Sequence, residues 1–378
     1  MLRKLIYFGF FLRLLIAICN GFFGPSLGAD MDAMSFHSEA VEYSKNLNFD
    51  EFRIGWIYSY GLGIFYFLFS DSLFMGSLLS CFAWLVSAFF LRDSMKLLSI
   101  SNSNAAKAMW IYIILPSSIL FASVTLREPY QLMFVNIAIF SALKIYLHRS
   151  LSYWILLIIA AIGMGVLHGA LFAFGFILII FLMMLISLRG SSKKSILKVF
   201  FISPAILLLL FYGFSLFTNV SYSLENGLGS AVEDFQQGCL NADGRANYKD
   251  DIEINGILGL VMFIPVSIFQ YLFEPMPWRV SALFDVAVLL ENCLRAWLIW
   301  KMMRGLRTAE NDERKILLFL FVLYMILETI WSLGTINWGT AMRHHLPSMG
   351  ILVLAAFFSA GFDKKNSAKL NSSKVQVV

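Results

Sequence analysis

Residues 152–188 read SYWILLIIAAIGMGVLHGALFAFGFILIIFLMMLISL and contain no Asp, Glu, Lys or Arg. The hydrocarbon core of a bilayer is about 30 Å thick, and a helix of roughly 17–25 mainly apolar residues crosses it. This stretch is therefore long enough for two crossings, the first of which ends at His168. We predict membrane-spanning helices over residues 152–168 and 171–188.

The rest of the chain repeats this pattern. Of its 378 residues, 59% are hydrophobic and 14% are charged, whereas soluble proteins average roughly 45–50% apolar and about 25% charged residues. The composition excludes a water-soluble enzyme, a disordered scaffold and a secreted disulfide-rich module. We predict an all-α, polytopic integral membrane protein with about ten transmembrane helices. The other predicted spans are residues 4–23, 72–91, 108–126, 130–147, 199–217, 283–300, 316–335 and 348–362.

Basic residues determine the predicted orientation, because short loops rich in Lys and Arg face the cytoplasm. Two further apolar stretches, residues 54–70 and 257–273, are interrupted by Gly or Pro. If both crossed the membrane, the basic cluster in residues 189–198 would lie outside, so we predict that they are interfacial or re-entrant segments. Both termini are then expected in the cytoplasm, and the outer side of the protein is acidic.

We expect a single polytopic domain over residues 1–362, followed by a polar cytoplasmic tail over residues 363–378. Two outer (periplasmic) loops, residues 24–71 and 218–282, are too long to be simple connections, and long loops in compact proteins are usually functional. The first loop contains residues 32–46, in which apolar residues recur near helical spacing. We predict an amphipathic helix that lies along the membrane surface there.

Ionisable residues in or beside the bilayer are costly and tend to have a role. In the predicted topology they gather at the outer face, and Asp30 and Asp32 follow the first span. A partly desolvated carboxylate at this place is suited to act as a general base, and an N-cap of the following helix is the alternative. His37 follows Asp32 by about one helical turn, which makes it a candidate for substrate or metal contact at the same site.

Arginines at the outer ends of two spans are candidates for phosphate binding, because the guanidinium fork matches phosphate oxygens. Arg127 and Glu128 follow one span, where anchoring of the helix at the interface is the alternative. Arg343 and His344 precede the last span, and this basic stretch on an acidic side favours a site for an anionic headgroup.

Charged residues inside the predicted spans require partners. Glu291 and Arg295 are four residues apart, the spacing of an ion pair on one helix face. Glu328 has no cation close to it in the sequence, and we expect it to face Arg13 or Arg295.

Several short motifs carry a family resemblance. Residues 28–37, GADMDAMSFH, resemble the stretch of aspartate, alanine, an aromatic residue and histidine near the start of many GT-C-type polytopic glycosyltransferases. That superfamily includes the dolichyl-phosphate-mannose protein mannosyltransferases and the aminoarabinose transferase that modifies lipid A. The Leu-Pro-Ser of residues 115–117 and the Leu-Arg-Glu of residues 126–128 are similar to an arrangement in the same proteins. Residues 274–278 and 337–344 resemble elements of bacterial relatives found with surface-polysaccharide genes.

The resemblance implies an inverting membrane glycosyltransferase of cell-envelope glycan assembly, located in the bacterial inner membrane with its site on the periplasmic face. Asp32, or its neighbour Asp30, would be the catalytic base. The donor phosphate would be bound by Arg343, Arg127 and His344. Substrate contacts would come from His37, Glu128, Glu274, Trp278 and Arg279.

The same resemblance implies particular partners. These are a polyprenyl-phosphate-linked sugar as donor, a glycan or lipid acceptor, and membrane lipids, with no nucleic acid. The resemblance makes no cofactor certain, and a divalent metal remains open.

Two other functions also remain open. An O-antigen-type polysaccharide polymerase is a near neighbour of the transferase, and a transporter or flippase of a lipid-linked oligosaccharide belongs to a different class. A transporter should carry polar groups through the bilayer midplane with openings on both sides. Here the charges in the motifs gather on one face, which favours an enzyme that faces outward.

Overall fold

The computed structural model describes residues 1–24, 29–47, 56–189, 246–249, 256–359 and 361. Within these residues the structure is helical, and its single β-type contact is an antiparallel bridge between Asn247 and Asn337. The helices are α1 (Leu2–Phe23), α2 (Asp30–Asn46), α3 (Ile57–Leu68), α4 (Leu73–Leu97), α5 (Asn102–Ile114), α6 (Pro116–Phe121), α7 (Glu128–His148), α8 (Ser152–Leu167), α9 (Gly169–Arg189), α13 (Gly256–Phe273), α14 (Leu283–Thr308), α15 (Asn311–Gly334), α16 (Trp338–His344) and a last helix, Met349–Ser359.

Five of the described helices are long and apolar enough to cross a membrane, namely α1, α4, α7, the Gly169–Ser187 part of α9, and α15. Shorter apolar helices accompany them at Ile57–Leu68, Ser152–Leu167, Val261–Phe273 and Met349–Ser359. The prediction of an all-helical membrane protein is therefore confirmed for the described residues. The total of about ten spans stays a prediction, and the predicted span at residues 199–217 and the tail at 363–378 lie outside the described residues.

One predicted span is broken. Residues 108–126 do not form a continuous helix, because α5 ends at Ile114 and α6 begins at Pro116. Proline has no backbone N–H to continue the helical ladder, and its ring disfavours helical backbone in the residue before it. The physical signal for this break was present in the sequence as Pro116.

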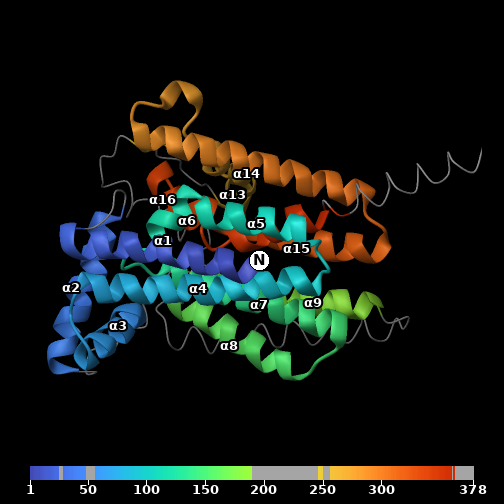
Figure 1. Cartoon of the computed structure of the whole chain (residues 1–378). Coiled ribbons are helices and arrows are strands. Elements are labelled where there is room, and N and C mark those ends of the chain that lie inside the picture. Colours follow the sequence, from blue (N-terminus) through green and yellow to red (C-terminus); the bar gives the residue numbers. More distant parts are fainter. Residues whose placement is uncertain (25–28, 48–55, 190–245, 250–255, 360, 362–378) are drawn as a thin grey trace, which may run out of the picture.

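The long helices run alongside one another in a bundle, and α1 lies between α4 and α5 (Figure 1). Helices α2 and α3 pack on each other at one end of this bundle, where α6 and α16 also lie (Figure 1). We call this the site end. The two segments predicted to be interfacial or re-entrant form the short helix α3 and the proline-containing helix α13. Their placement relative to a membrane stays a prediction.

The predicted amphipathic segment is confirmed as helix α2. Its apolar face, which includes the buried Ala33, Ala40 and Tyr43, packs mainly against α3 and the bundle. The close approach depends on Gly63, because a Cβ atom at that position would lie 2.8 Å from the carbonyl oxygen of Ala40. Asp32 lies on the polar face of α2 and is directed toward α16.

Buried charges hold the bundle together. The Arg13 guanidinium in α1 is fully buried, donates to the carbonyls of Gly9 (3.0 Å) and Ile113 (3.1 Å), and lies 3.6 Å from the centre of the Trp84 ring. These contacts connect α1 to α4 and α5, so this charge inside a span has a structural role.

The predicted Glu291–Arg295 ion pair is confirmed at 3.3 Å, and Glu291 also accepts hydrogen bonds from the backbone and hydroxyl of Ser117. The expectation for Glu328 is wrong. Its carboxylate bonds to Nδ1 of His345 at 2.6 Å and to Ser348 instead of facing an arginine. The partner is brought to it by the chain reversal after α15, which the local spacing does not reveal.

Candidate functional site

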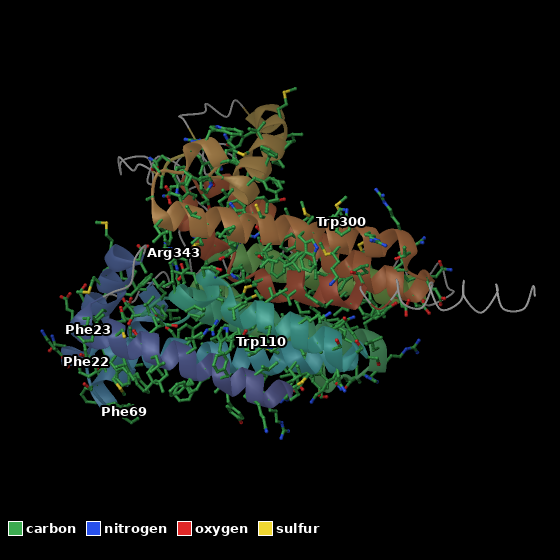
Figure 2. The ribbon with its side chains drawn as sticks, turned by 45° about the horizontal axis from the view of Figure 1, so that its top comes forward. Phe22, Phe23, Phe69, Trp110, Trp300 and Arg343 are labelled. Atoms are coloured by element: carbon green, nitrogen blue, oxygen red, sulfur yellow. The ribbon has the colours of Figure 1, made fainter. Side chains whose placement is uncertain are left out.

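Arg343 lies between two carboxylates at the site end of the bundle (Figure 2). Its Nη1 atom donates to Oδ2 of Asp32, and its Nε atom is 3.9 Å from Oε1 of Glu128. The three side chains come from α16, α2 and α7. Arg343 and Glu128 are 10% and 4% exposed, whereas the Asp32 side chain is 52% exposed. The arrangement is a buried cation with one buried and one accessible acid.

Local structure explains how two of these side chains are presented. Helix α2 begins after Ala29, and no side chain caps it, so Asp32 sits in the third helical position with its carboxylate free for Arg343. The N-cap alternative for Asp32 is therefore wrong. Helix α16 begins after Asn337, whose Oδ1 accepts from the backbone N–H of Thr340 at 2.7 Å. This cap starts a short helix that ends with Arg343 in its last turn.

Asp30, the other candidate base, is the first residue of α2, and its side chain lies outside the described residues. The structure therefore gives Asp32 a defined partner and leaves the role of Asp30 a prediction.

The Arg343 site contains buried polar atoms with no hydrogen-bond partner in the described structure. They are Nε of Arg343 and Oε2 of Glu128. Such atoms are rare in folded proteins, and each leaves hydrogen-bonding capacity that a ligand or water can use. Burial alone would lower the pKa of Arg343, but the carboxylates of Glu128 and Asp32 outweigh it and raise this pKa above its ordinary value. The guanidinium stays charged and has capacity for a bound anion.

Arg127 is the second arginine near this place, directly before α7. Its Nη1 atom is 3.5 Å from the carbonyl oxygen of Leu167, and its guanidinium carbon lies 5.6 Å from the Phe36 ring centre. It also acts electrostatically on His168 and His344. Arg127 therefore lies close enough to contribute positive potential to the group that surrounds Arg343.

His344 is buried, and its ring contacts Trp331 and Thr335. Its ring stacks on Trp331 with centroids 4.2 Å apart, and its Nδ1 atom is 2.8 Å from Oγ1 of Thr335. Burial, and next the charge of Arg343, lowers the pKa of His344 well below its ordinary value. A neutral ring supplies no positive charge to a phosphate, and the binding of phosphate by His344 stays a prediction.

A second histidine at this place was not among the predicted site residues. The ring centroids of His168 and Trp331 are 4.6 Å apart, and the charge of Arg127 acts on the His168 ring. His168 and His344 both contact Trp331, and the indole thus connects the break between α8 and α9 to α16. The position of His168 at the end of a predicted span was the only signal for it.

His37 is not brought to Asp32. Its Nδ1 atom is 2.9 Å from the hydroxyl of Tyr66 in α3, and the two rings meet edge to face. Burial lowers the pKa of His37, against a smaller opposing effect of Asp71. Five residues along a helix correspond to a rotation of about 140° from the starting direction. His37 consequently faces α3 while Asp32 faces α16.

Glu274 and Arg279 form a separate cluster before α14. Their ion pair is 3.1 Å long, and Arg279 also donates to the carbonyl oxygen of Asn247 at 2.9 Å. Its guanidinium carbon lies 5.5 Å from the ring of Trp338, the first residue of α16. Trp278 beside them is 80% exposed. The cluster touches the start of α16, whereas the Arg343 site lies at its end.

Among the described residues, no group of three or more His, Cys, Asp and Glu side chains could hold a metal ion. Asp32 and Glu128 are both directed at a guanidinium, which occupies the position that a cation would take. No family model, curated protein or solved structure matches this chain. A proposal for the function therefore rests on the sequence, the fold and the geometry of the site.

Proposed function

We propose that this chain is a GT-C-type membrane glycosyltransferase that takes a sugar from a polyprenyl-phosphate carrier at the periplasmic face of a bacterial inner membrane. The observation that carries the proposal is the meeting of Asp32, Glu128 and Arg343 at one end of the bundle. Each residue was a candidate for a different role in transfer. Their convergence from α2, α7 and α16 supports one site.

The chemistry follows from the charges in this site. The acceptor hydroxyl forms a bond to the anomeric carbon, and the bond from that carbon to the phosphate oxygen breaks with its electron pair on the phosphate. Arg343 would stabilise the growing negative charge, because a guanidinium donates two parallel hydrogen bonds to phosphate oxygens. Asp32, with its accessible carboxylate, would take the acceptor proton.

The resting contact between Arg343 and Asp32 couples these two roles. Donor phosphate and the Asp32 carboxylate compete for the same guanidinium, because Asp32 already holds its Nη1 atom. Bound donor would release Asp32 and leave it free to act as base. Glu128 is nearly fully buried beside Nε and would keep Arg343 oriented during the exchange.

The setting of the site supports a donor with a membrane-embedded carrier. Phe22, Phe23 and Phe69 lie at the same end of the molecule as Arg343 (Figure 2) and expose most of their side chains. Aromatic residues of this kind are enriched at membrane interfaces. A phosphate bound at Arg343 would then lie at headgroup level, with the polyprenyl chain in the bilayer.

Two experiments test the proposed function, one in cells and one with the purified protein. Surface glycans of a strain that lacks this chain are profiled by gel and mass spectrometry after complementation with wild type, Asp32→Asn, Arg343→Lys or Lys315→Gln. Lys315 is the matched control, because it belongs to an exposed ion pair with Asp312 at the start of α15. We expect the first two variants to lack the glycan change that wild type and Lys315→Gln restore.

Purified protein in lipid nanodiscs with polyprenyl-phosphate sugars then tests transfer directly. Full activity of Asp32→Asn and Arg343→Lys would refute the proposed site. A defect in glycan chain length with unchanged sugar transfer would indicate the polymerase. Loss of lipid-linked oligosaccharide from the outer leaflet without any transferase activity would indicate the flippase.

A further inference from the structure

A basic cavity lies at the end of the bundle opposite the Arg343 site. It has a volume of about 450 Å³ and is formed where the first turn of α1, the last turns of α4 and the start of α5 meet. Its lining residues are Met1, Leu2, Arg3, Arg92, Lys96 and Asn102.

Helix α4 shows the distance between the cavity and the site end. Gly76, near the start of α4, packs against Thr125 and Tyr66, in the region of α2, α3 and α7. At 1.5 Å per residue, Lys96 lies about 30 Å further along the same helix. The cavity is thus separated from the proposed transferase site by about the thickness of a bilayer core.

The lining carries an excess of positive charge. Arg92 donates to both oxygens of Asp93, at 2.8 and 2.9 Å, and its guanidinium carbon lies 4.8 Å from the Phe89 ring centre. Lys96 is 3.3 Å from the same carboxylate. One acid is therefore shared between two cations, and Arg3 adds a third cation to the lining. The start of α5 contributes the positive end of its helix dipole.

Exposed apolar surface continues from this cavity along both sides of α1. On one side Tyr7 meets Phe89 of α4 with ring centroids 6.0 Å apart, and on the other Phe8 meets Trp110 of α5 at 5.7 Å. Tyr7 and Phe8 are 55% and 48% exposed. Trp110 lies on α5 in Figure 2. A cationic cavity with exposed aromatic surface on both sides of α1 is complementary to a phosphate headgroup that carries two acyl chains.

We propose that this cavity binds the headgroup of an anionic diacyl phospholipid, with its acyl chains along α1 against α4 and α5. Basic pockets between membrane helices are suited to anionic headgroups, and each Lys or Arg near the surface adds attraction. A zwitterionic headgroup brings its own ammonium group into a cationic lining and is disfavoured. The site is independent of the proposed transferase activity, because it shares no residue with the Arg343 site.

Retention of lipid by the purified protein tests the proposal. Wild type, the Arg3→Gln/Lys96→Gln variant and the control Lys144→Gln/Lys315→Gln are titrated with phosphatidylglycerol or phosphatidylcholine in detergent, and bound lipid is counted by native mass spectrometry. The control removes the same charge from α7 and α15, outside the cavity lining. Arg3 and Lys96 are both exposed, and a thermal unfolding curve checks that each variant is folded.

We expect wild type and control to retain phosphatidylglycerol over phosphatidylcholine. The cavity variant should bind phosphatidylglycerol about 25-fold more weakly, because each basic residue contributes about fivefold. Equal phosphatidylglycerol affinity of the folded cavity variant and the control would overturn the proposal. So would equal affinity of wild type for both lipids, or displacement of the lipid by millimolar inorganic phosphate, which would indicate a site for free phosphate.

Discussion

The guanidinium of Arg343 contacts the carboxylate of Asp32 across 311 positions of sequence. Asp32 is half exposed at the polar face of α2, whereas Arg343 is buried at the end of α16 and also lies 3.9 Å from Glu128. The accessible acid can leave the arginine, and the buried acid cannot easily do so. This asymmetry separates a residue that can exchange with a ligand from one that holds the arginine in place.

Asp32→Asn separates catalysis from stability. Because its pair with Arg343 is open to solvent on the Asp32 side, we expect the free energy of unfolding to fall by no more than about 1 kcal/mol. Loss of a general base should lower the transfer rate about 10²–10⁴-fold. Sugar transfer in nanodiscs and thermal unfolding in detergent measure the two effects. A rate equal to wild type would show that Asp32 only pairs with Arg343.

Removal of Arg343 should have a larger effect on stability. Arg343→Met leaves Glu128 buried without its cation, and the loss of one partner of a buried pair costs about 3–5 kcal/mol. The Arg343→Met/Glu128→Gln double variant removes both charges and should recover part of this loss. The double-mutant cycle is measured by chemical or thermal unfolding. Strict additivity of the two substitutions would show that Glu128 and Arg343 do not interact.

From the buried Lys249 we predict that the stability of the fold depends on pH. Its Nζ atom donates to Oγ of Ser267 at 2.9 Å and to the carbonyl oxygen of Ser332, and burial lowers its pKa to about 7. Between pH 7 and about 10.5 the unfolded chain binds more protons at this lysine than the folded chain. The free energy of unfolding therefore rises with pH in this window.

Below pH 7 both states of Lys249 are protonated, and the cost of burying its charge is fully present. Thermal unfolding at pH 6.5 and pH 9 compares wild type with Lys249→Met, in which this contribution is absent. We expect the pH-dependent gain in Tm to be smaller in the variant. An identical gain in both proteins would show that Lys249 keeps an ordinary pKa.

Gly350 tests the packing of the last helix on α7. A Cβ atom at this position would lie 1.9 Å from Oδ1 of Asn136, whose amide is held by Ser87 and by the Tyr112 hydroxyl. Gly350→Ala should therefore destabilise the protein by about 1–3 kcal/mol. Gly61→Ala in α3 is the control, because a Cβ atom there meets nothing within 4 Å. The control should be neutral or stabilising by up to about 1 kcal/mol.

Thermal unfolding midpoints of the two alanine variants measure this difference in stability. Equal midpoints for Gly350→Ala and Gly61→Ala would mean that the last helix shifts easily from α7, which contradicts the tight contact at Asn136.

Sequence patterns among residues close together in the chain were sufficient to predict the membrane helices, helix α2 and one ion pair. The apolar runs predicted membrane helices, the spacing in residues 32–46 predicted α2, and the four-residue spacing of Glu291 and Arg295 predicted their ion pair. Each of these features depends on residues within a few helical turns, and hydropathy and helical periodicity report on that range directly. Pro116 also carried a local signal for the break between α5 and α6, although the apolar run around it concealed the break.

Contacts between distant helices could be obtained only from the packed fold. Asp32, Glu128 and Arg343 could each be singled out in the sequence as charges near the end of a predicted span, but their meeting depends on how α2, α7 and α16 pack. The same holds for Glu328, whose partner is His345 in place of an arginine. A buried charge takes whichever partner the packing brings within hydrogen-bond distance, because its desolvation must be compensated. That choice is a property of the whole bundle, and no local spacing encodes it.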